Sequence, residues 1–299
     1  MSYPIIQLHA DAPTQLEQLG TKTKFWYRDD TGRSILFKEG RPGTGENWAE
    51  KVSCEICKLL GIPHADYDLA VWKKRKGVAT PNFVPDGGRL VLGNELLAKV
   101  IDGYDGGQRY QVRQHTVRAV MAVASSKLIG FPLAWIPPSV IKDAAGVFVG
   151  YLMLDALIGN QDRHHENWGL IWQPNEGVSF APAFDHASSL GRNENDQVRN
   201  EMLITRDRGR SVETYVARAR SAFFASPTSS KPMGTLEAFQ EAAKIRPEAA
   251  RYWLEQLAKL NPEDFRTVLA NVPDSEISIP ARDFACRMLD VNSQRISTE

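Results

Sequence analysis

Hydrophobic and polar residues alternate with the two-residue period of β-strands in two stretches near the start of the chain. The first, residues 23–40 (TKFWYRDDTGRSILFKEG), has two runs rich in aromatic and β-branched side chains around Asp29-Asp30-Thr31-Gly32. A polar tetrapeptide between two such runs predicts a β-hairpin. Residues 67–84 predict a second hairpin, with the basic run Lys73–Lys76 at its solvated tip.

A helix is predicted between the two hairpins, over residues 47–60. Apolar residues recur there at helical spacing, and Gly61 and Pro63 provide a stop signal. Cys54 and Cys57 lie inside this pattern and, because the chain has only one further cysteine, they are expected to pack in the core rather than bind zinc. The residues predicted on the buried face are Trp48, Val52, Ile56, Leu59 and Leu60.

After Pro85-Asp86-Gly87-Gly88, a sequence typical of a turn, hydrophobic residues recur at the spacing of α-helices. Residues 116–129 predict a helix that stops at Gly130, and residues 139–158 are apolar nearly all round, as in a fully buried helix. Further helices follow, one of them starting at Asn261-Pro262. The stripe predicted for the first of these helices is Val117, Val120, Met121, Ala124 and Leu128.

These elements predict an α+β fold with two lobes. Residues 1–88 would form a small strand-rich lobe with one main helix, and residues 89–299 a larger, mostly helical lobe. The 36 basic and 36 acidic residues balance, so the net charge favours neither a nucleic-acid nor a membrane partner. No apolar run approaches the ~20 residues of a membrane span, and the first residues do not resemble a signal peptide. With three cysteines, a reducing, cytoplasmic setting is expected.

A cluster of polar residues follows the predicted buried helix, in the segment LDALIGNQDRHHENWGLIW (154–172). Asp162 and Asn167 are five positions apart, and a predicted hairpin over 168–180 leads to Asp185. Because a hairpin returns its second strand beside its first, Asp185 is expected near Asn167. Phosphoryl transfer needs a carboxylate at the attacking hydroxyl and oxygen ligands for Mg²⁺, and protein kinases space these groups as D-x-x-x-x-N followed by an Asp after a short hairpin.

The first lobe contains the remaining elements that a kinase needs. Lys38 ends a predicted strand and would contact the nucleotide phosphates, and Glu50 in the next helix would hold it. The segment LGTKTK precedes this strand pair, where a phosphate-covering loop is needed. The residues of that predicted loop are Gly20, Thr21, Lys22 and Lys24.

Each of these residues also has a structural interpretation. Lys38 could be a solvated strand end, and Glu50 the third residue of a capping box with Asn47. Gly20 could be a turn glycine, and Asp162 could cap a helix or pair with Arg163. The histidines suggest a transition-metal hydrolase, but H-E-x-x-H is absent, as is the Lys-Ser/Thr end of a Walker A loop. The order of loop, strand Lys, helix Glu, D-x4-N and Asp favours a kinase. The histidines concerned are His164, His165 and His186.

LIGNQDRHHENWG followed by APAFDHASSLG resembles the HipA-like kinases, relatives of the phosphatidylinositol 3/4-kinase fold, as do shorter segments between Gly20 and Tyr215. The resemblance implies a bilobal kinase that uses Mg²⁺ and ATP to phosphorylate Ser or Thr of a protein. It makes Asp162 the catalytic base and Asn167 and Asp185 the Mg²⁺ ligands. It also places Lys38, Glu50, His164 and the predicted loop in the nucleotide site, with the adenine near Asn82, Phe83 and Val84.

Two departures from toxin-type members of this family concern regulation. Their nucleotide loop is serine-rich and can be autophosphorylated, whereas the loop here contains only threonines. They also have an extra N-terminal subdomain, but few residues precede Gly20 here, so a shared antitoxin interface is not implied. The expected partners are a protein substrate and an antitoxin or regulatory protein. A small-molecule or lipid kinase and an inactive nucleotide-binding module are the alternatives.

The segment 186–215 after Asp185 is polar and would be the activation segment of a kinase. It is either a mobile surface loop or a surface whose arginines meet an acidic or phosphorylated acceptor. Its arginines are Arg192, Arg199, Arg206, Arg208 and Arg210, and its candidate phosphorylation sites are Ser188, Ser189, Thr205 and Ser211.

Overall fold

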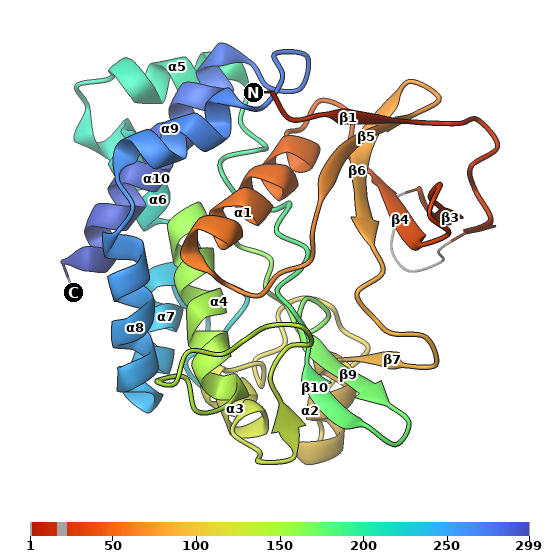
Figure 1. Cartoon of the computed structure of the whole chain (residues 1–299). Coiled ribbons are helices and arrows are strands. Elements are labelled where there is room, and N and C mark those ends of the chain that lie inside the picture. The colour runs from red at the N-terminus through yellow and green to blue at the C-terminus, as the bar shows by residue number, and fades with distance from the viewer. Residues whose placement is uncertain (1, 17–22, 299) are drawn as a thin grey trace.

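The computed structural model describes residues 2–16 and 23–298. Its first part is a six-stranded sheet in the order β1-β5-β6-β4-β3-β2, in which β1 and β5 are parallel and the other neighbours antiparallel (Figure 1). One helix, α1, accompanies this sheet. The elements are β1 (Ile5–Leu8), β2 (Gln15–Leu16), β3 (Lys24–Arg28), β4 (Ser34–Glu39), α1 (Glu46–Leu60), β5 (Asp68–Trp72) and β6 (Arg75–Pro81).

Both predicted hairpins are confirmed. In the β3–β4 pair Phe25 lies opposite Phe37 and Tyr27 opposite Ile35, and all four side chains are buried. The ring centroids of Phe25 and Phe37 are 5.0 Å apart, and Trp72 of β5 meets Phe25 at 4.8 Å. Because side chains alternate across a strand, this aromatic cluster leaves Leu36 and Lys38 on the opposite face, toward α1 and the rest of the protein.

Helix α1 confirms the predicted helix between the hairpins. It ends at Gly61, whose φ of +68° is in the left-handed region that glycine adopts without strain. Trp48, Val52 and Ile56 are buried, and they share one hydrophobic core with the C-terminal helices. The prediction for Leu59 was wrong, because its side chain is 43% exposed.

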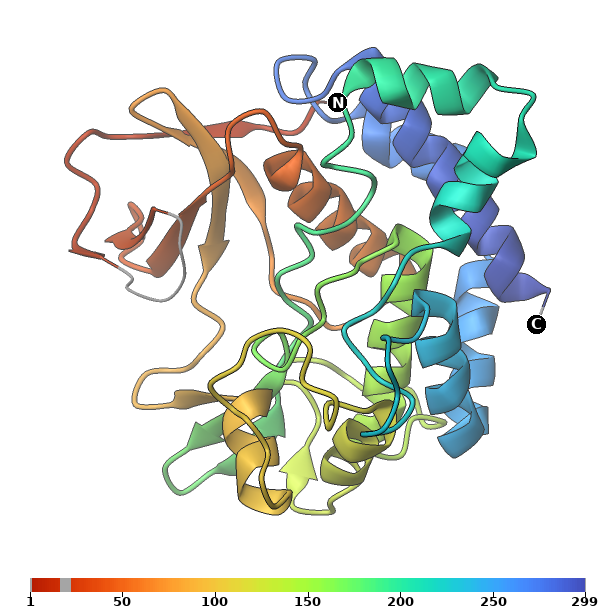
Figure 2. The ribbon, with the colours of Figure 1, turned by 180° about the vertical axis from the view of Figure 1, so that it is seen from behind.

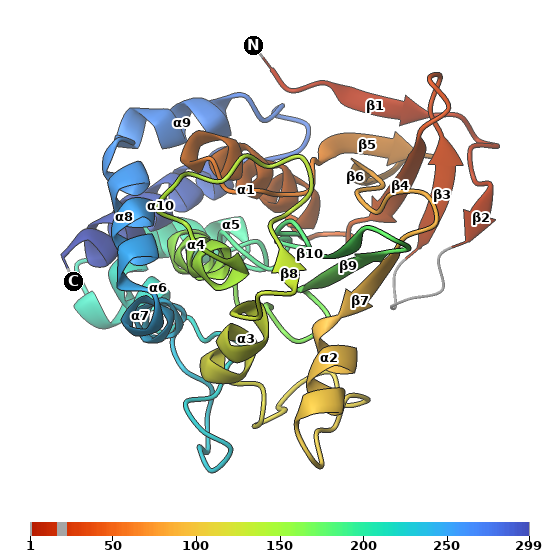
Figure 3. The same cartoon turned by 60° about the horizontal axis from the view of Figure 1, so that its bottom comes forward.

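The second part of the chain contains a four-stranded sheet, β7-β9-β10-β8, and most of the helices (Figure 3). The hairpin predicted over 168–180 is confirmed as the β9–β10 pair. The elements are β7 (Arg89–Leu92), α2 (Gly93–Val100), α3 (Val117–Ala124), β8 (Ile129–Gly130), α4 (Ala144–Ile158), β9 (Gly169–Gln173), β10 (Gly177–Phe180), α5 (Asp196–Ile204), η1 (Arg208–Arg210), α6 (Val212–Ala217), α7 (Thr235–Ile245), α8 (Pro247–Ala258), α9 (Pro262–Ala270) and α10 (Ile279–Ser297).

Helix α4 is the centre of the helical part, as its all-apolar sequence predicted, but it begins at Ala144 instead of at Ser139. All 15 of its residues are buried, and α3, α7, α8 and α10 pack around it. Asp143 caps its start by accepting a hydrogen bond from the N–H of Gly146 at 2.9 Å. Gly159, with a φ of +65°, ends the helix and turns the chain into the polar segment. The end of this apolar helix therefore sets the position at which the polar segment leaves the core.

Helix α3 is shorter than predicted. It ends at Ala124 with Ser125 as its C-cap, and the N–H of Ser126 bonds to the carbonyl of Val123 at 3.1 Å, three residues back instead of the four of an α-helix. Leu128 was predicted on the buried stripe, but it is 85% exposed. Gly130 belongs to β8 instead of stopping the helix.

Residues 181–195 leave β10 and pass between α1 and α4 to reach α5, as the view from behind shows (Figure 2). The chain then forms α5 and α6, which pack on α10. The prediction of a mobile loop over 186–215 was therefore wrong for its second half. Val212 and Val216 explain the difference, because they bury against Phe284 and Met288 of α10. Within the described residues, no helix is both long and apolar enough to cross a membrane.

Gly150 in α4 offers a test of this packing. A Cβ added there would lie 2.6 Å from the indole of Trp253, and α8 holds that ring in the core. We expect Gly150→Ala to lower the free energy of unfolding by about 1–3 kcal/mol, the usual cost of overpacking. Chemical denaturation measures this change. Gly107→Ala is the control, since its Cβ would meet only Asp105 at an ordinary 3.6 Å. Equal stability of both variants would contradict the packing described here.

Candidate active site

A polar pocket forms between β3 and β4 on one side and the segments that follow α4 and β10 on the other. Lys24, Lys38, Asp162 and Asp185 all line it. These residues are up to 161 positions apart in the chain, and three of them are the predicted strand Lys, catalytic Asp and metal-binding Asp. The pocket is also lined by Arg41, Glu46, Arg109, Tyr110, Ala187, Ser188 and Arg192.

Lys38 connects the two parts of the protein. Its Nζ donates to Oδ1 of Asp185 and lies 3.7 Å from Oε2 of Glu50. Burial alone would lower the pKa of Lys38, but the carboxylates of Asp185 and Glu50 outweigh it and raise the pKa to about 12. Lys38 is therefore a charged, largely buried side chain, and the interpretation as a solvated strand end was wrong.

Glu50 is completely buried and faces Lys38. Its Oε1 accepts a hydrogen bond from the backbone N–H of His186 at 2.6 Å, so it also holds the residue after Asp185. The capping-box interpretation was wrong, because α1 begins at Glu46 with Gly45 as its N-cap and Asn47 is already inside the helix.

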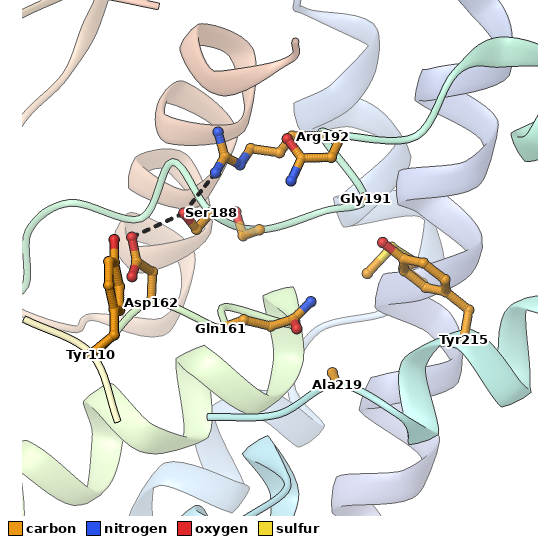
Figure 4. A pocket seen from close by; sticks show the side chains of 12 residues that line it. Tyr110, Gln161, Asp162, Ser188, Gly191, Arg192, Tyr215 and Ala219 are labelled. Atoms are coloured by element: carbon orange, nitrogen blue, oxygen red, sulfur yellow. Dashed lines mark hydrogen bonds between the residues drawn. The ribbon is translucent and has the colours of Figure 1, made fainter. Parts of the chain in front are cut away.

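Asp162 lies in the loop after α4. Its backbone N–H donates to Oδ1 of Asn160 at 3.1 Å, and its Oδ2 accepts a hydrogen bond from the Ser188 hydroxyl at 3.2 Å (Figure 4). Burial, and then the negative charge of Asp185, raises the pKa of Asp162 above its ordinary value. A carboxylate with a raised pKa takes up a proton more readily, which suits a general base.

Arg163 fixes the position of both polar segments. Its guanidinium makes two hydrogen bonds to the Asp155 carboxylate of α4, at 2.8 and 2.7 Å. It also donates to the carbonyls of Asn167, at 3.1 Å, and of Phe184, at 3.4 Å. Sequence reasoning missed this role and offered Asp162 as the partner of Arg163. The signal was Asp155 itself, a carboxylate in an otherwise apolar helix.

Asn167 and Asp185 supply oxygen atoms of the kind that Mg²⁺ prefers. The side-chain N–H of Asn167 donates to the carbonyl of Asp162 at 2.6 Å, which leaves the amide oxygen for a ligand. Asp185 has a φ of +57°, a strained conformation for a residue with a side chain. Asp162 and Asp185 also repel each other across the pocket, as the raised pKa of Asp162 records. A divalent cation would relieve this repulsion, so the residues present fit a metal ion.

His164 is buried outside the Lys38 pocket. Its Nε2 accepts a hydrogen bond from the Arg109 guanidinium at 3.0 Å, and burial followed by Arg109 lowers its pKa to about 3. His165 bonds instead to the hydroxyl of Tyr104, at 2.7 Å, and His186 lies against Glu50. The three histidines therefore do not converge on a metal site.

Phe83 does not line the Lys38 pocket with its side chain. Its ring stacks on Phe184 with centroids 5.6 Å apart, and both pack near Tyr67. The Tyr67 hydroxyl accepts the backbone N–H of Asp185 at 3.3 Å. The side chain of Phe83 thus packs against the residue that precedes Asp185. Gly20, Thr21 and Lys22 of the predicted nucleotide loop lie outside the described residues.

The arginines after Asp185 are in different environments. Arg192 pairs with Glu46 of α1, and its Nη2 donates to the Ser188 hydroxyl at 3.0 Å. Arg199 is buried, where it bonds to Asp196 at 2.8 Å and to the carbonyl of Gly191 at 3.1 Å. Arg206, Arg208 and Arg210 are exposed, and of these Arg210 lines a hollow next to Tyr215.

Comparisons with known proteins identify a family and related proteins. The model of the HipA-like C-terminal domain matches residues 16–263. The serine/threonine-protein kinase CtkA of Helicobacter pylori (strain J99) is 27% identical over 161 residues, 54% of this chain. The match spans 45% of that relative's length.

Solved structures show the same fold. A Helicobacter pylori proinflammatory kinase CtkA structure has a TM-score of 0.74 at 19% identity, over 99% of this chain and 98% of that chain. A chain from the Shewanella oneidensis MR-1 complex of HipA, HipB and operator DNA has a TM-score of 0.57 at 14% identity, over 96% and 68%. The fold is therefore protein-kinase-like, as predicted. With the family model covering most of its length, the chain belongs to the HipA-like C-terminal domain family.

Proposed function

We propose that this protein is a kinase that transfers the γ-phosphoryl group of ATP to a serine or threonine hydroxyl of a protein substrate. The observation that carries the proposal is the pocket in which Lys38, held by Glu50, meets Asp185 while Asp162 faces them. A kinase needs these charges in this arrangement. The Helicobacter pylori relative CtkA, a serine/threonine-protein kinase, supports the choice of acceptor.

Each residue has a chemical role in this proposal. Lys38 neutralises the nucleotide phosphates, and its high pKa keeps it charged throughout the physiological range. Asn167 and Asp185 would hold Mg²⁺, which supplies positive charge to the phosphoryl group being transferred. Asp162 orients the acceptor hydroxyl and receives its proton. Arg163 has an indirect role and positions other residues. It connects the loop of Asp162 and the segment of Asp185 to the same carboxylate in α4.

The lobe boundaries, the nucleotide loop and the adenine contact are proposed from the order of the elements along the chain. We infer a nucleotide-binding lobe over residues 1–88 and a catalytic lobe over 89–299, with Gly20, Thr21, Lys22 and Lys24 closing over the phosphates. The backbone of residues 82–84, between β6 and β7, is the proposed contact of the adenine ring. HipA in the Shewanella structure is complexed with HipB and DNA, and a regulatory or antitoxin protein is the corresponding proposal here.

Mg-ATP binding and phosphoryl transfer test this function together. ATP at 100 times its Kd should stabilise the folded protein by about 2.7 kcal/mol, seen as a rise in Tm. Asp162→Asn should keep this shift but reduce transfer of labelled phosphate by about 10²–10⁴-fold, because it removes the base. Asp185→Asn should weaken the shift itself, because it removes a metal ligand.

The control for these two variants is Asp102→Asn, an exposed aspartate outside the pocket. Absence of any Mg-ATP shift, or normal turnover of Asp162→Asn, would overturn the proposal. If label were transferred to molecules of a lipid or metabolite extract but never to protein, this protein would be a lipid or small-molecule kinase instead.

Glu50→Gln separates catalysis from stability. Glutamine keeps an oxygen for the N–H of His186 but loses the charge that faces Lys38. We expect transfer to fall by about tenfold or more, equivalent to roughly 1.4 kcal/mol of transition-state stabilisation, with little change in Tm. Glu55→Gln, on the same helix but paired with Lys51 and Lys58, should retain full activity. Full activity of Glu50→Gln would show that the ion pair between Glu50 and Lys38 is not needed for catalysis.

The pH dependence of transfer reports on Asp162. The base works only when deprotonated, and burial together with Asp185 raises its pKa. Activity should therefore be lost as pH falls, with a midpoint above the ~3.9 of an ordinary aspartate. The pH dependence of kcat/KM, which reports on the free enzyme before Mg²⁺ offsets the charge of Asp185, measures the midpoint. Thermal unfolding without ligand over the same pH range shows that the fold persists. A rate that remains constant down to the ordinary aspartate range would contradict the role.

A further inference from the structure

Ser188 occupies an unusual position for a side chain of this segment. It lies three residues after Asp185, and its hydroxyl donates to Oδ2 of Asp162 at 3.2 Å (Figure 4). Nη2 of Arg192 donates to the same Ser188 oxygen at 3.0 Å. Arg192 in turn is fixed by the Glu46 carboxylate and by its own carbonyl, which accepts the N–H of Gly45 at 3.0 Å. The serine is thus held against the proposed catalytic base.

The hydrogen bonds give this hydroxyl the protonation pattern of an attacking group. A serine hydroxyl has one proton and two lone pairs. Here the proton points to the Asp162 carboxylate and one lone pair accepts from Arg192, which leaves the second lone pair for bond formation. A proton directed at a base and a lone pair left over are what general-base activation of a nucleophile requires.

The location of Ser188 relative to the two pockets agrees with this pattern. Ser188 and Asp162 line both the pocket of Lys38 and Asp185 and an adjoining pocket that extends to Tyr215. The two pockets share these two residues together with Tyr110 and Arg192, so the serine stands between the proposed phosphate side and the open acceptor side.

The other hydroxyl groups of the segment are used differently. Ser189 is buried and donates to the carbonyl of His186 at 2.7 Å. Ser211 caps α6, and the Thr205 oxygen accepts the N–H of Asp207. None of these three is bonded to Asp162, so geometry singles out Ser188 among the candidate sites.

We propose that Ser188 is an intramolecular phosphoryl acceptor, and that its phosphorylation switches this protein off. The inference rests on the proposed kinase function. In the transfer, Ser188 Oγ forms a bond to the γ-phosphorus of ATP while the bond from that phosphorus to the β,γ-bridging oxygen breaks. The hydroxyl proton moves to Asp162, and ADP leaves with the bonding electrons. The products are phosphoserine and ADP, and no further reactant is needed.

The consequence for activity follows from charge. A phosphoserine carries about −1.5 to −2 charges at neutral pH. It would pair with Arg192, since guanidinium binds phosphate well. It would also stand beside Asp162 and fill the place where an external hydroxyl must approach. Phosphorylated protein should therefore transfer to other substrates about 10²-fold more slowly, the scale of a lost general-base contribution.

The test uses the full chain after phosphatase treatment and removal of the phosphatase. With Mg-ATP, intact-mass measurement should show the addition of one phosphoryl group, and peptide mapping should place it on Ser188. Because the acceptor belongs to the same molecule, the rate per chain should not change with protein concentration. Wild-type protein should also fail to label added Asp162→Asn chains at Ser188. Transfer to dephosphorylated casein, measured before and after labelling, reports the switch.

Three variants make the outcome decisive. Ser188→Ala should lose the label and no longer slow down after preincubation with ATP, Ser188→Thr should retain a label at that position, and Thr205→Ala should behave as wild type. Phosphorylation of casein with no phosphate at position 188 would overturn this inference but leave the kinase function intact. Ser188 would then only orient Asp162, and Ser188→Ala would lower kcat from the first turnover. Failure of casein labelling and of ATP-induced stabilisation would overturn the proposed function itself.

Discussion

The buried ion pair between Asp155 and Arg163 is the interaction on which the geometry of the pocket depends. Asp155 lies in the fully buried α4, so an isolated charge there would be costly unless it were paired and hydrogen-bonded. Arg163 satisfies it with two hydrogen bonds and uses its remaining donors on the carbonyls of Asn167 and Phe184. One guanidinium therefore aligns two segments that a hairpin separates in sequence. Removing either partner would leave a buried charge and release both segments together.

The contact of Lys38 with Asp185 depends on this alignment. Lys38 comes from the first sheet, whereas Asp185 follows the second, and only tertiary packing brings them together. Glu50 adds a second connection, because its two oxygens face Lys38 and the backbone of His186. The raised pKa of Lys38 shows that attraction outweighs the cost of burying the charge. The pocket is thus assembled by charges from three elements before any ligand enters.

Much of this arrangement was predictable from sequence, because it is encoded in local patterns and chain order. The two hairpins, the apolar α4 and the polar residues after Gly159 identified Lys38, Asp162, Asn167 and Asp185 as one group.

The errors arose where distant contacts decide the outcome. Leu128 fits a helical stripe, but the chain leaves the helix at Ser125 and pairs with β10 at Ile129. Segment 186–215 lacks a clear apolar period, yet Val212 and Val216 bury against α10, which lies far along the chain. The partner of Arg163 could not be predicted from the spacing of residues in the sequence. Asp162 is adjacent to Arg163 in the chain, but the carboxylate that Arg163 binds in the folded protein is that of Asp155.

The burial of α1 limits how this protein can be controlled. Trp48, Val52 and Ile56 belong to the same core as the C-terminal helices, so swinging α1 outward would expose all three. At about 1.5–3 kcal/mol for each side chain, that cost exceeds the 1–3 kcal/mol or so that an effector typically supplies. An inactive state in which the Glu50 helix rotates away is therefore too rare to serve as an off switch. Inhibitors designed to trap such a state would have almost no population of it to bind. The selectivity of an inhibitor would have to come from contacts with the strands and loops around the pocket.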